Sequence, residues 1–190
     1  MILGYHGTDE STAKKVINNR HQLLGSDNQY DWLGNGIYFW ENDPQRAKEY
    51  IIEKFKREKI RKKTAVIGAI IDLGFCLNLL ERVYIDEVKL SYDYLTVMDE
   101  VTENEFPRNH SSLHTDTIPL KRDLDCAVIQ NIHLTRKNVK LPEYDTVRSA
   151  FIEGDELYHN AGFKKKNHIQ VCVRNQENIL GYFWPPLEED

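Results

Sequence analysis

Two tyrosines and two closely spaced glycines carry the clearest chemical signal in this sequence. Gly34-Asn35-Gly36 runs directly into Ile37-Tyr38-Phe39, and Tyr50 follows further along the chain. Glycines let a ligand approach the main chain closely, and two phenol rings can lie on either side of one flat aromatic group. The pattern therefore predicts a pocket for a flat, polar ring. The alternative is that Tyr38 and Tyr50 are ordinary core residues.

A short strand followed by a helix must position these rings. Residues 37–40 are apolar and aromatic, which favours a buried strand. Asn42-Asp43-Pro44 offers a helix N-cap and a proline at the first helical position. Apolar residues then recur at helical spacing, namely Ala47, Tyr50, Ile51 and Phe55. Tyr50 is thus expected on a helix that starts close to the strand of Tyr38.

A second strand-to-helix junction is expected at the N-terminus. Residues 2–5 predict a strand that ends at His6-Gly7-Thr8, and either Thr8 or Asp9 can cap the following helix. That helix would carry Ala13, Val16 and Ile17 on one face. Such a junction exposes backbone groups to a ligand, so His6 and Gly7 are expected to face one. Residues 18–33 predict a loop that leads to the two glycines.

The remaining pattern predicts an α+β fold of mainly antiparallel strands, in a single domain spanning residues 1–190. Residues 64–72 form an almost continuous apolar run, typical of a central strand, and residues 85–99 show helical spacing. The polar stretch 102–122 predicts a long loop, whereas residues 125–132 fit either a helix or a strand. Further strands are expected at 145–152, 167–174 and 179–184.

Charge and cysteine usage exclude several classes of protein. With 25 basic and 30 acidic residues, the formal net charge is −5, so no global field attracts nucleic acid. The basic residues between Lys54 and Lys63 offer a local patch or simply a solvated helix face. Three well-separated cysteines indicate buried thiols in a reducing compartment, and no His or Cys cluster predicts a metal site. Since no apolar run could span a bilayer, a cytoplasmic location without a membrane partner is expected.

Three motifs, in this order, resemble the NAD-binding core of ADP-ribosyltransferases of the diphtheria-toxin and poly(ADP-ribose) polymerase type. They are His6-Gly7-Thr8, Gly34-Asn35-Gly36-Ile37-Tyr38-Phe39 and Ala47-Lys48-Glu49-Tyr50, which cover about the first third of the chain. The resemblance implies an ADP-ribosyltransferase-like split β-sandwich with helices packed at its side. It also implies that NAD is the substrate.

Roles for the matched residues follow from the same resemblance. It implies that Gly7 holds the nicotinamide carboxamide through its backbone, and that His6 bonds the adenosine-side ribose. Tyr38 and Tyr50 would sandwich the nicotinamide ring. The NAD-binding set that it implies is His6, Gly7, Thr8, Gly36, Tyr38 and Tyr50. Cleavage of the nicotinamide–ribose bond passes through an oxocarbenium-like centre, so such a site must hold the leaving group rigidly and exclude water.

The third catalytic position departs from the pattern of the family. Many of its polymerases carry a glutamate at the start of a late strand, where this chain offers Gln170, or His168 if the register differs by two. Glutamine can bond a ribose hydroxyl but cannot take a proton, which favours transfer of a single ADP-ribose. Glu153 could supply the base, and Arg148 could pair with a pyrophosphate. Alternatively, Arg148 and Glu153 form a surface ion pair or merely solvate a strand end, and His168 is a strand-edge histidine that bonds backbone.

We therefore expect an NAD-dependent mono-ADP-ribosyltransferase of the toxin or defence kind, acting on a protein or nucleic-acid acceptor. A partner that neutralises the activity is part of this hypothesis. One alternative is a non-catalytic module that binds NAD or ADP-ribose, which the glutamine at position 170 motivates. Another is an RNA 2′-phosphotransferase-like enzyme, which would need a positive rim. Its candidate residues are Arg148, Lys164, Lys165, Lys166 and Arg174.

Overall fold

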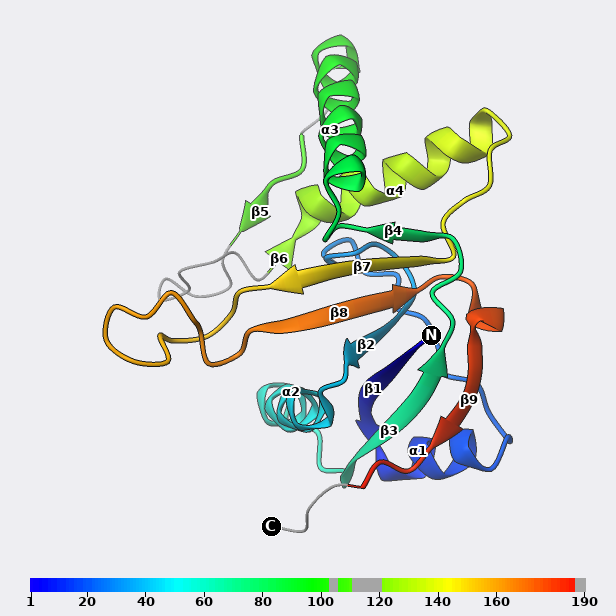
Figure 1. Cartoon of the computed structure of the whole chain (residues 1–190), viewed down its shortest axis with the longest axis vertical. Coiled ribbons are helices and arrows are strands. Elements are labelled where there is room, and N and C mark those ends of the chain that lie inside the picture. Colours follow the sequence, from blue (N-terminus) through cyan, green and yellow to red (C-terminus); the bar gives the residue numbers. More distant parts are fainter. Residues whose placement is uncertain (103–105, 111–120, 187–190) are drawn as a thin grey trace.

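The computed structural model describes residues 1–102, 106–110 and 121–186. Within these ranges the chain forms helices and short strands that alternate along the sequence (Figure 1). In chain order they are β1 (Ile2–Asp9), α1 (Glu10–Ile17), β2 (Ile37–Glu41), α2 (Pro44–Arg57), β3 (Thr64–Ile71), β4 (Cys76–Asn78), α3 (Arg82–Thr102), β5 (Asn109–His110), β6 (Lys121–Arg122), α4 (Asp123–Asn138), β7 (Thr146–Phe151), β8 (His168–Val173), η1 (Gln176–Asn178) and β9 (Ile179–Phe183).

Seven strands of the described chain form one sheet in the order β4-β7-β8-β2-β1-β3-β9. The β4–β7 pair is parallel, and the other neighbours in this sheet are antiparallel. Strands β5 and β6 pair separately over two residues each. In Figure 1, α3 and α4 lie toward the β4 edge, and α1 and α2 lie toward β1 and β3. The expected α+β architecture of mainly antiparallel strands is therefore confirmed.

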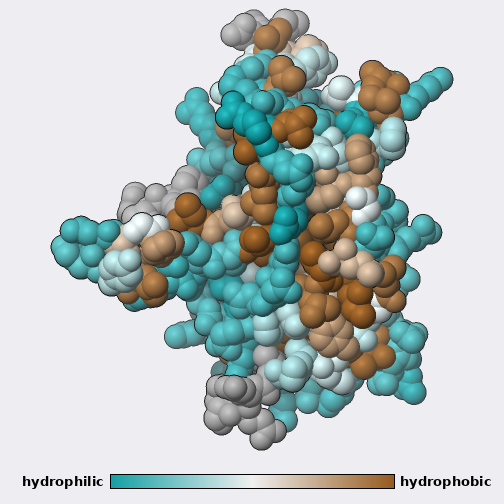
Figure 2. Space-filling model, in the orientation of Figure 1, coloured by the Kyte–Doolittle hydropathy of each residue, from teal (hydrophilic) through white to brown (hydrophobic). Residues whose placement is uncertain are grey.

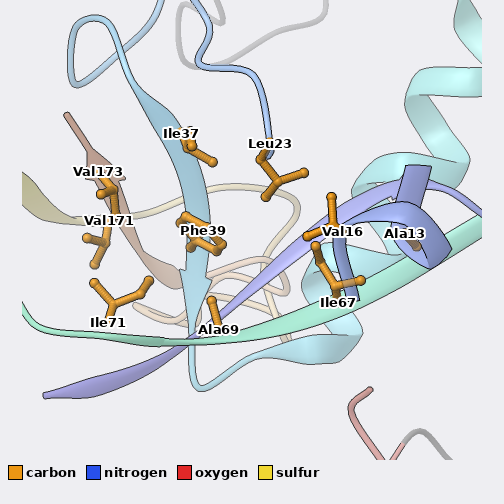
Figure 3. Packing of buried hydrophobic residues seen from close by; sticks show 10 residues of the cluster. All are labelled: Ala13, Val16, Leu23, Ile37, Phe39, Ile67, Ala69, Ile71, Val171 and Val173. Carbon is orange, nitrogen blue, oxygen red and sulfur yellow. The ribbon is translucent and has the colours of Figure 1, made fainter. Parts of the chain in front are cut away.

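One face of the sheet packs against α1. Its core is a cluster of buried apolar side chains that point toward one another from α1 and from β2, β3 and β8 (Figure 3). Successive strand residues point to opposite faces, so every second residue of these strands contributes to it. The members are Ala13, Val16, Leu23, Ile37, Phe39, Ile67, Ala69, Ile71, Val171 and Val173.

The opposite face is covered by α2 and α4. Ala47 and Tyr50 of α2 pack against Trp40 of β2, in a cluster that also holds Tyr5 and Val66. In a separate cluster, α4 packs Ile129 and Ile132 against Val147, Cys172 and the ring of Tyr38. Tyr38 and Trp40 alternate with the residues of β2 that face α1, so both rings lie on this side of the sheet.

Aspartates begin the first two helices. Asp9 accepts a hydrogen bond from the backbone N–H of Thr12 at 3.1 Å, and Asp43 accepts one from Arg46 N–H at 2.8 Å. Pro44 follows Asp43 at the first helical position. Each carboxylate satisfies an N–H that has no partner within its helix. The predicted start of α2 is thus confirmed, and Asp9 is the cap of α1.

The expected junction at His6 and Gly7 is wrong, because β1 continues to Asp9. His6, Gly7 and Thr8 pair with residues 67, 66 and 65 of β3. The long apolar strand β3 offers a ladder partner for each of them, and the ladder satisfies backbone groups that a junction would leave open. These three residues therefore lie within a strand near the middle of the sheet.

The C-terminal strands and the helix predicted at 85–99 are confirmed, with α3 longer than expected. The helix α4 occupies the stretch that sequence patterning left open between helix and strand. It starts with acidic residues, and Asn109 Oδ1 accepts from the N–H groups of Leu124 and Asp125 at 3.1 and 3.2 Å. Strand β4 was not predicted. Of the loop predicted at 102–122, residues 103–105 and 111–120 lie outside the described residues.

Part of the sheet carries exposed apolar side chains. Figure 2 shows brown residues gathered in the region of β1, β3 and β9. Leu3, Ile70 and Leu180 belong to these three strands and are 40%, 40% and 57% exposed. Separately, none of the described helices is both long and apolar enough to cross a membrane.

Candidate functional site

The strands β1 and β2 separate at the two N-terminal motifs. Their pairing is limited to Gly4 with Glu41 and Tyr5 with Trp40. Beyond this point the His6 ring bridges the strands, since its Nδ1 lies 2.8 Å from the carbonyl oxygen of Tyr38. A carbonyl only accepts, so Nδ1–H donates. Burial lowers the pKa of His6, which leaves a neutral ring whose Nε2 is an acceptor.

Tyr38 is fixed by its hydroxyl as well as by its backbone. The hydroxyl donates to Gly34 O at 2.7 Å and accepts from Leu33 N–H at 2.9 Å. Its ring is partly buried on the α4 side of the sheet. Burial raises the pKa of Tyr38, and Cys172 and Asp31 add to this rise. Tyr38 therefore anchors the loop formed by Gly34, Asn35 and Gly36, here called the glycine loop, to the sheet.

Tyr50 lies on α2 against Trp40, with ring centroids 4.8 Å apart and an interplanar angle of 44°. Burial also raises the pKa of Tyr50, with a further contribution from Asp31. Tyr38 and Tyr50 thus lie on one face of the sheet, but each ring has its own neighbours and the two make no direct ring contact among those described.

Two glycines of the motifs permit close packing. A Cβ on Gly7 would lie 2.5 Å from the carbonyl oxygen of Ala47 and 2.8 Å from Cβ of Ile51, so only glycine lets α2 lie directly on β1 here. A Cβ on Gly36 would lie 2.6 Å from Sγ of Cys172 on β8. Thr8 pairs with Ala65 at the end of β1. The glycines therefore bring α2 and β8 against the strands that carry His6 and Tyr38.

Gln170 lies on the same face as the two tyrosines. It pairs with Trp40 of β2 on one side and with Ser149 of β7 on the other. Gln170 and Ser149 are both partly exposed. Because β8 alternates, His168 and Cys172 share this face with Gln170. Among the predicted catalytic residues, Gln170 is thus the one closest in register to Trp40.

Arg148 lies on the opposite face and forms a closed ion pair. Its Nε and Nη2 donate to the two carboxylate oxygens of Glu41 at 2.6 and 2.8 Å, and Nη1 donates to Asn78 Oδ1 at 3.4 Å. These hydrogen bonds raise the pKa of Arg148. The structure therefore does not bring Arg148 together with Tyr38, Tyr50 or Gln170. The alternative of an Arg148–Glu153 pair is wrong, because each has another partner.

Glu153 pairs instead with Arg46, at the first turn of α2. Arg46 Nη2 lies 3.1 Å from Glu153 Oε2, and Nδ1 of His168 lies 3.9 Å from the same oxygen. His168 Nδ1 donates to the carbonyl oxygen of Lys166 at 2.6 Å. Burial lowers the pKa of His168, and Arg46 acts in the same direction, so the ring is neutral near pH 7. The alternative in which His168 bonds backbone is confirmed.

Arg46 and Trp40 carry no signal of a site in the sequence. The guanidinium carbon of Arg46 lies 6.0 Å from the centre of the Trp40 ring, and the His168 ring lies 6.4 Å from it on centroids. Arg46 is 5% exposed and Trp40 3%. An arginine in a first helical turn looks like a solvated charge in the sequence, and only its neighbours in space reveal the burial. We call Trp40, Arg46, Glu153 and His168 the polar cluster.

The basic residues of the third hypothesis each face a carboxylate. Lys164 pairs with Glu156 at 3.6 Å, Lys165 with Asp155 at 3.8 Å and Lys166 with Glu53 at 2.7 Å. Arg174 pairs with Glu143 at 3.1 Å, and Arg148 is held by Glu41. These five residues therefore form no continuous positive rim, which disfavours an RNA 2′-phosphotransferase-like function.

The cysteines are free thiols, and two of them are buried. Burial raises the pKa of Cys126 to about 11 and that of Cys172 to about 12, so neither is a thiolate near neutral pH. Cys76 is partly exposed. Across the described residues, no group of three His, Cys, Asp or Glu side chains could hold a metal ion.

An open cleft of about 660 Å³ lies between the glycine loop and the start of α4. Its walls come from residues 27–29 and Asn35, from residues 106–108 and His110, and from α4. His110 Nδ1 lies 3.4 Å from Asp123 Oδ2 inside it. None of the residues given a catalytic or NAD-binding role from the sequence lines this cleft.

Comparison with known proteins gives similarity without a function. The uncharacterized protein MJ0359 of Methanocaldococcus jannaschii is 29% identical over 208 aligned residues, which cover 97% of this chain and 87% of that protein. No family model matches the chain, and no solved structure matches it. The similarity thus covers nearly the whole chain, and the name of that relative states no activity.

Proposed function

We propose that this chain is an NAD-dependent mono-ADP-ribosyltransferase with an ADP-ribosyltransferase-like fold. The observation that carries the proposal is the separation of β1 from β2 where His6 bonds the carbonyl oxygen of Tyr38. This contact joins the His-Gly and Gly-x-Gly-Ile-Tyr-Phe motifs, which are 32 residues apart at these positions. A strand pair that opens in this way offers backbone and side-chain groups to a ligand in the middle of a sheet.

The chemistry requires a broken glycosidic bond and a new one. Nicotinamide leaves with the electron pair of its bond to C1′ of the ribose, and a nucleophile of the acceptor bonds to C1′ and loses its proton. Tyr38 and Tyr50 would hold the leaving ring, and Gln170 would bond the ribose next to it. His6 lies on the opposite, α1 side of the sheet, with its ring 5.7 Å from that of Phe39 on centroids, so its neutral Nε2 would accept from the adenosine-side ribose only across the gap between β1 and β2. Glu153 is 21% exposed at its side chain and could take the proton.

Nicotinamide release tests the proposal. The full chain is mixed with NAD and candidate protein or nucleic-acid acceptors, and free nicotinamide is measured. Tyr50→Ala should reduce release by about 100-fold, because it removes one wall of the leaving-group site. The control is Tyr94→Ala, at a position on α3 that is 53% exposed, and its release should equal that of the wild type. Release that survives Tyr50→Ala unchanged, or that never occurs, contradicts the proposal.

A second function has its own supporting observation. Gln170 supplies no carboxylate on β8, and Glu153 is already paired with Arg46, so the chain could bind NAD or ADP-ribose without cleaving it. Calorimetry separates the two functions. Binding of NAD with no nicotinamide release indicates the binding module, and binding with release indicates the transferase.

A further inference from the structure

The polar cluster contains buried polar atoms that have no hydrogen-bond partner. They are Nε1 of Trp40, Nε and Nη1 of Arg46, and Nε2 of His168. All three side chains are more than nine-tenths buried, at 3%, 5% and 8% exposure for the residues. A buried polar group without a partner destabilises the fold, and native proteins contain few of them. Four such atoms in one cluster therefore need an explanation.

Their chemical roles can be assigned from the contacts that are made. Trp40 Nε1 and the two Arg46 nitrogens are donors only. His168 donates through Nδ1 to the carbonyl of Lys166, so Nε2 of the neutral ring is an acceptor. The cluster thus offers donors and one acceptor on neighbouring side chains. A group that satisfies them must itself accept hydrogen bonds and donate at least one.

The charge around the cluster disfavours an anion. Arg46 contributes one positive charge, but Glu153 lies 3.1 Å from it and Asp43 caps the same helical turn. Asp43 also acts on the His168 ring. With a neutral His168, the carboxylates outnumber the cation, so a phosphate or carboxylate would meet net negative charge. An uncharged partner fits better.

Aromatic rings surround these atoms. His168 stacks on Phe151 with centroids 5.6 Å apart at an angle of 29°, and Trp40 contacts Tyr50 at 4.8 Å. Such surroundings suit a flat ring that carries its polar atoms at one edge.

We propose that Trp40, Arg46 and His168 form a binding site for an uncharged planar amide group on a flat ring. The amide oxygen accepts from Trp40 Nε1–H and from Arg46, and the amide N–H donates to His168 Nε2. Nicotinamide carries such a group, and so do several nucleobases. The assignment to nicotinamide rests on the proposed function, whereas the amide chemistry rests on the cluster alone.

The site is closed in this structure, because the four unpartnered atoms are shielded from solvent. We place its opening between α2 and the loop that joins β7 to β8, where Glu153 contacts Arg46 and Lys166 contacts Glu53. Most of that loop is exposed, from residue 154 to residue 160 without interruption, and Glu153 connects it to Arg46. Its displacement separates Arg46 Nη2 from Glu153 and opens the cluster to the ring.

Ligand titrations test the site on the full chain. Nicotinamide, nicotinate and uridine are titrated separately, by calorimetry or by the shift in melting temperature. Nicotinamide should bind at least about tenfold more tightly than nicotinate, since the carboxylate cannot donate to His168 and adds negative charge. Uridine that binds as well as nicotinamide would identify a nucleobase as the source of the amide.

Matched variants connect the binding to the cluster. Trp40→Phe keeps a ring and removes the indole N–H, so it should weaken the binding of nicotinamide at least about fivefold. Trp184→Phe, the same change at a position that is 48% exposed, should leave binding unchanged. If Trp40→Phe does not fold, Arg46→Met provides the same test. Absence of binding by every amide, equal binding of nicotinate, or binding unaffected by both variants overturns the site.

These outcomes are separable from the proposed function. Suppose that the protein releases nicotinamide from NAD, but Trp40→Phe and Arg46→Met leave amide binding unchanged. This result refutes the site and keeps the transferase. Amide binding that depends on Trp40, in a protein that never cleaves NAD, keeps the site and refutes the transferase.

Discussion

Two arginines on opposite faces of the sheet have opposite surroundings. Arg148 has all three guanidinium nitrogens bonded, two of them to Glu41 in a bidentate pair. Arg46 is more buried, yet only its Nη2 has a partner while Nε and Nη1 have none. A guanidinium whose donors are all satisfied is explained by the fold itself. One that is buried with free donors is a better candidate for ligand binding, although the sequence pointed to the other arginine.

The largest expected loss of stability follows substitution of Arg148, the arginine whose three nitrogens are all hydrogen-bonded. Arg148→Met should lower the free energy of unfolding by roughly 3 kcal/mol, because Glu41, whose side chain is 8% exposed, keeps its charge without a partner. Urea denaturation measures the change. The double variant Arg148→Met/Glu41→Leu should recover most of the loss. A single variant as stable as the wild type would remove the contrast between the two arginines.

A buried histidine on α4 also has polar atoms without a hydrogen-bond partner, and it should make the stability of the protein depend on pH. His133 is 2% exposed and neither ring nitrogen has a partner. Burial lowers its pKa to about 3, with Arg174 and Arg136 acting in the same direction. As the pH falls, the unfolded chain therefore binds a proton at this histidine before the folded chain does. The contribution of neutral His133 to the free energy of unfolding is fully present above about pH 6.5 and is lost as the pH drops toward 3.

His133→Leu should remove this part of the pH dependence. Relative to the variant, the wild type should lose about 1.4 kcal/mol of unfolding free energy per pH unit below about pH 6. Denaturation of both proteins at about pH 6, 5 and 4 gives the difference. Parallel curves across this range would show that His133 is not held neutral by the fold.

The hydroxyl of Tyr38 gives a smaller effect. It is bonded to both Gly34 and Leu33, so Tyr38→Phe should lower the free energy of unfolding by about 1 kcal/mol. Tyr94→Phe on the exposed face of α3 serves as the control and should leave stability unchanged. Equal stability of Tyr38→Phe and the wild type would contradict the role of this hydroxyl in anchoring the glycine loop.

The smallest expected effect on stability is at Arg46. Arg46→Met keeps most of the side-chain volume and removes two donors that have no partner, and Glu153 remains accessible to water. The loss should stay below about 1 kcal/mol. Measuring the unfolding free energies of Arg46→Met and Arg148→Met side by side tests the difference between the two arginines directly. A loss as large as that of Arg148→Met would show that Arg46 is a structural residue.

Local signals predicted much of the fold. Asp43-Pro44 marked the start of α2, the apolar run at 64–72 marked β3, and alternation at 167–174 marked β8. These signals act over a few residues, through capping, burial and side-chain period. Residues 125–132 are too short a stretch to distinguish helix from strand by pattern, and part of the N-terminal capping of α4 comes from Asn109, which lies outside that stretch.

The predicted site was recovered only in part. Tyr38, Tyr50, Gln170 and His168 do share one face of the sheet. The extension of β1 through His6 and Gly7 depended on pairing with β3, which local pattern does not reveal. Glu153 was singled out for its carboxylate, but its partner on α2 lies 107 residues away in sequence.

The sequence alone determined most of the strands and helices and the residues able to do chemistry, because short-range preferences set them. Which face each side chain occupies and which partner it finds were decided by the tertiary structure. Arg148 and Glu41 are also 107 residues apart, and they meet because β7, β8 and β2 are neighbours in one register. A shift of one residue in that register would move the side chain of Arg148 to the other face, and with it the distinction between a structural arginine and a binding one.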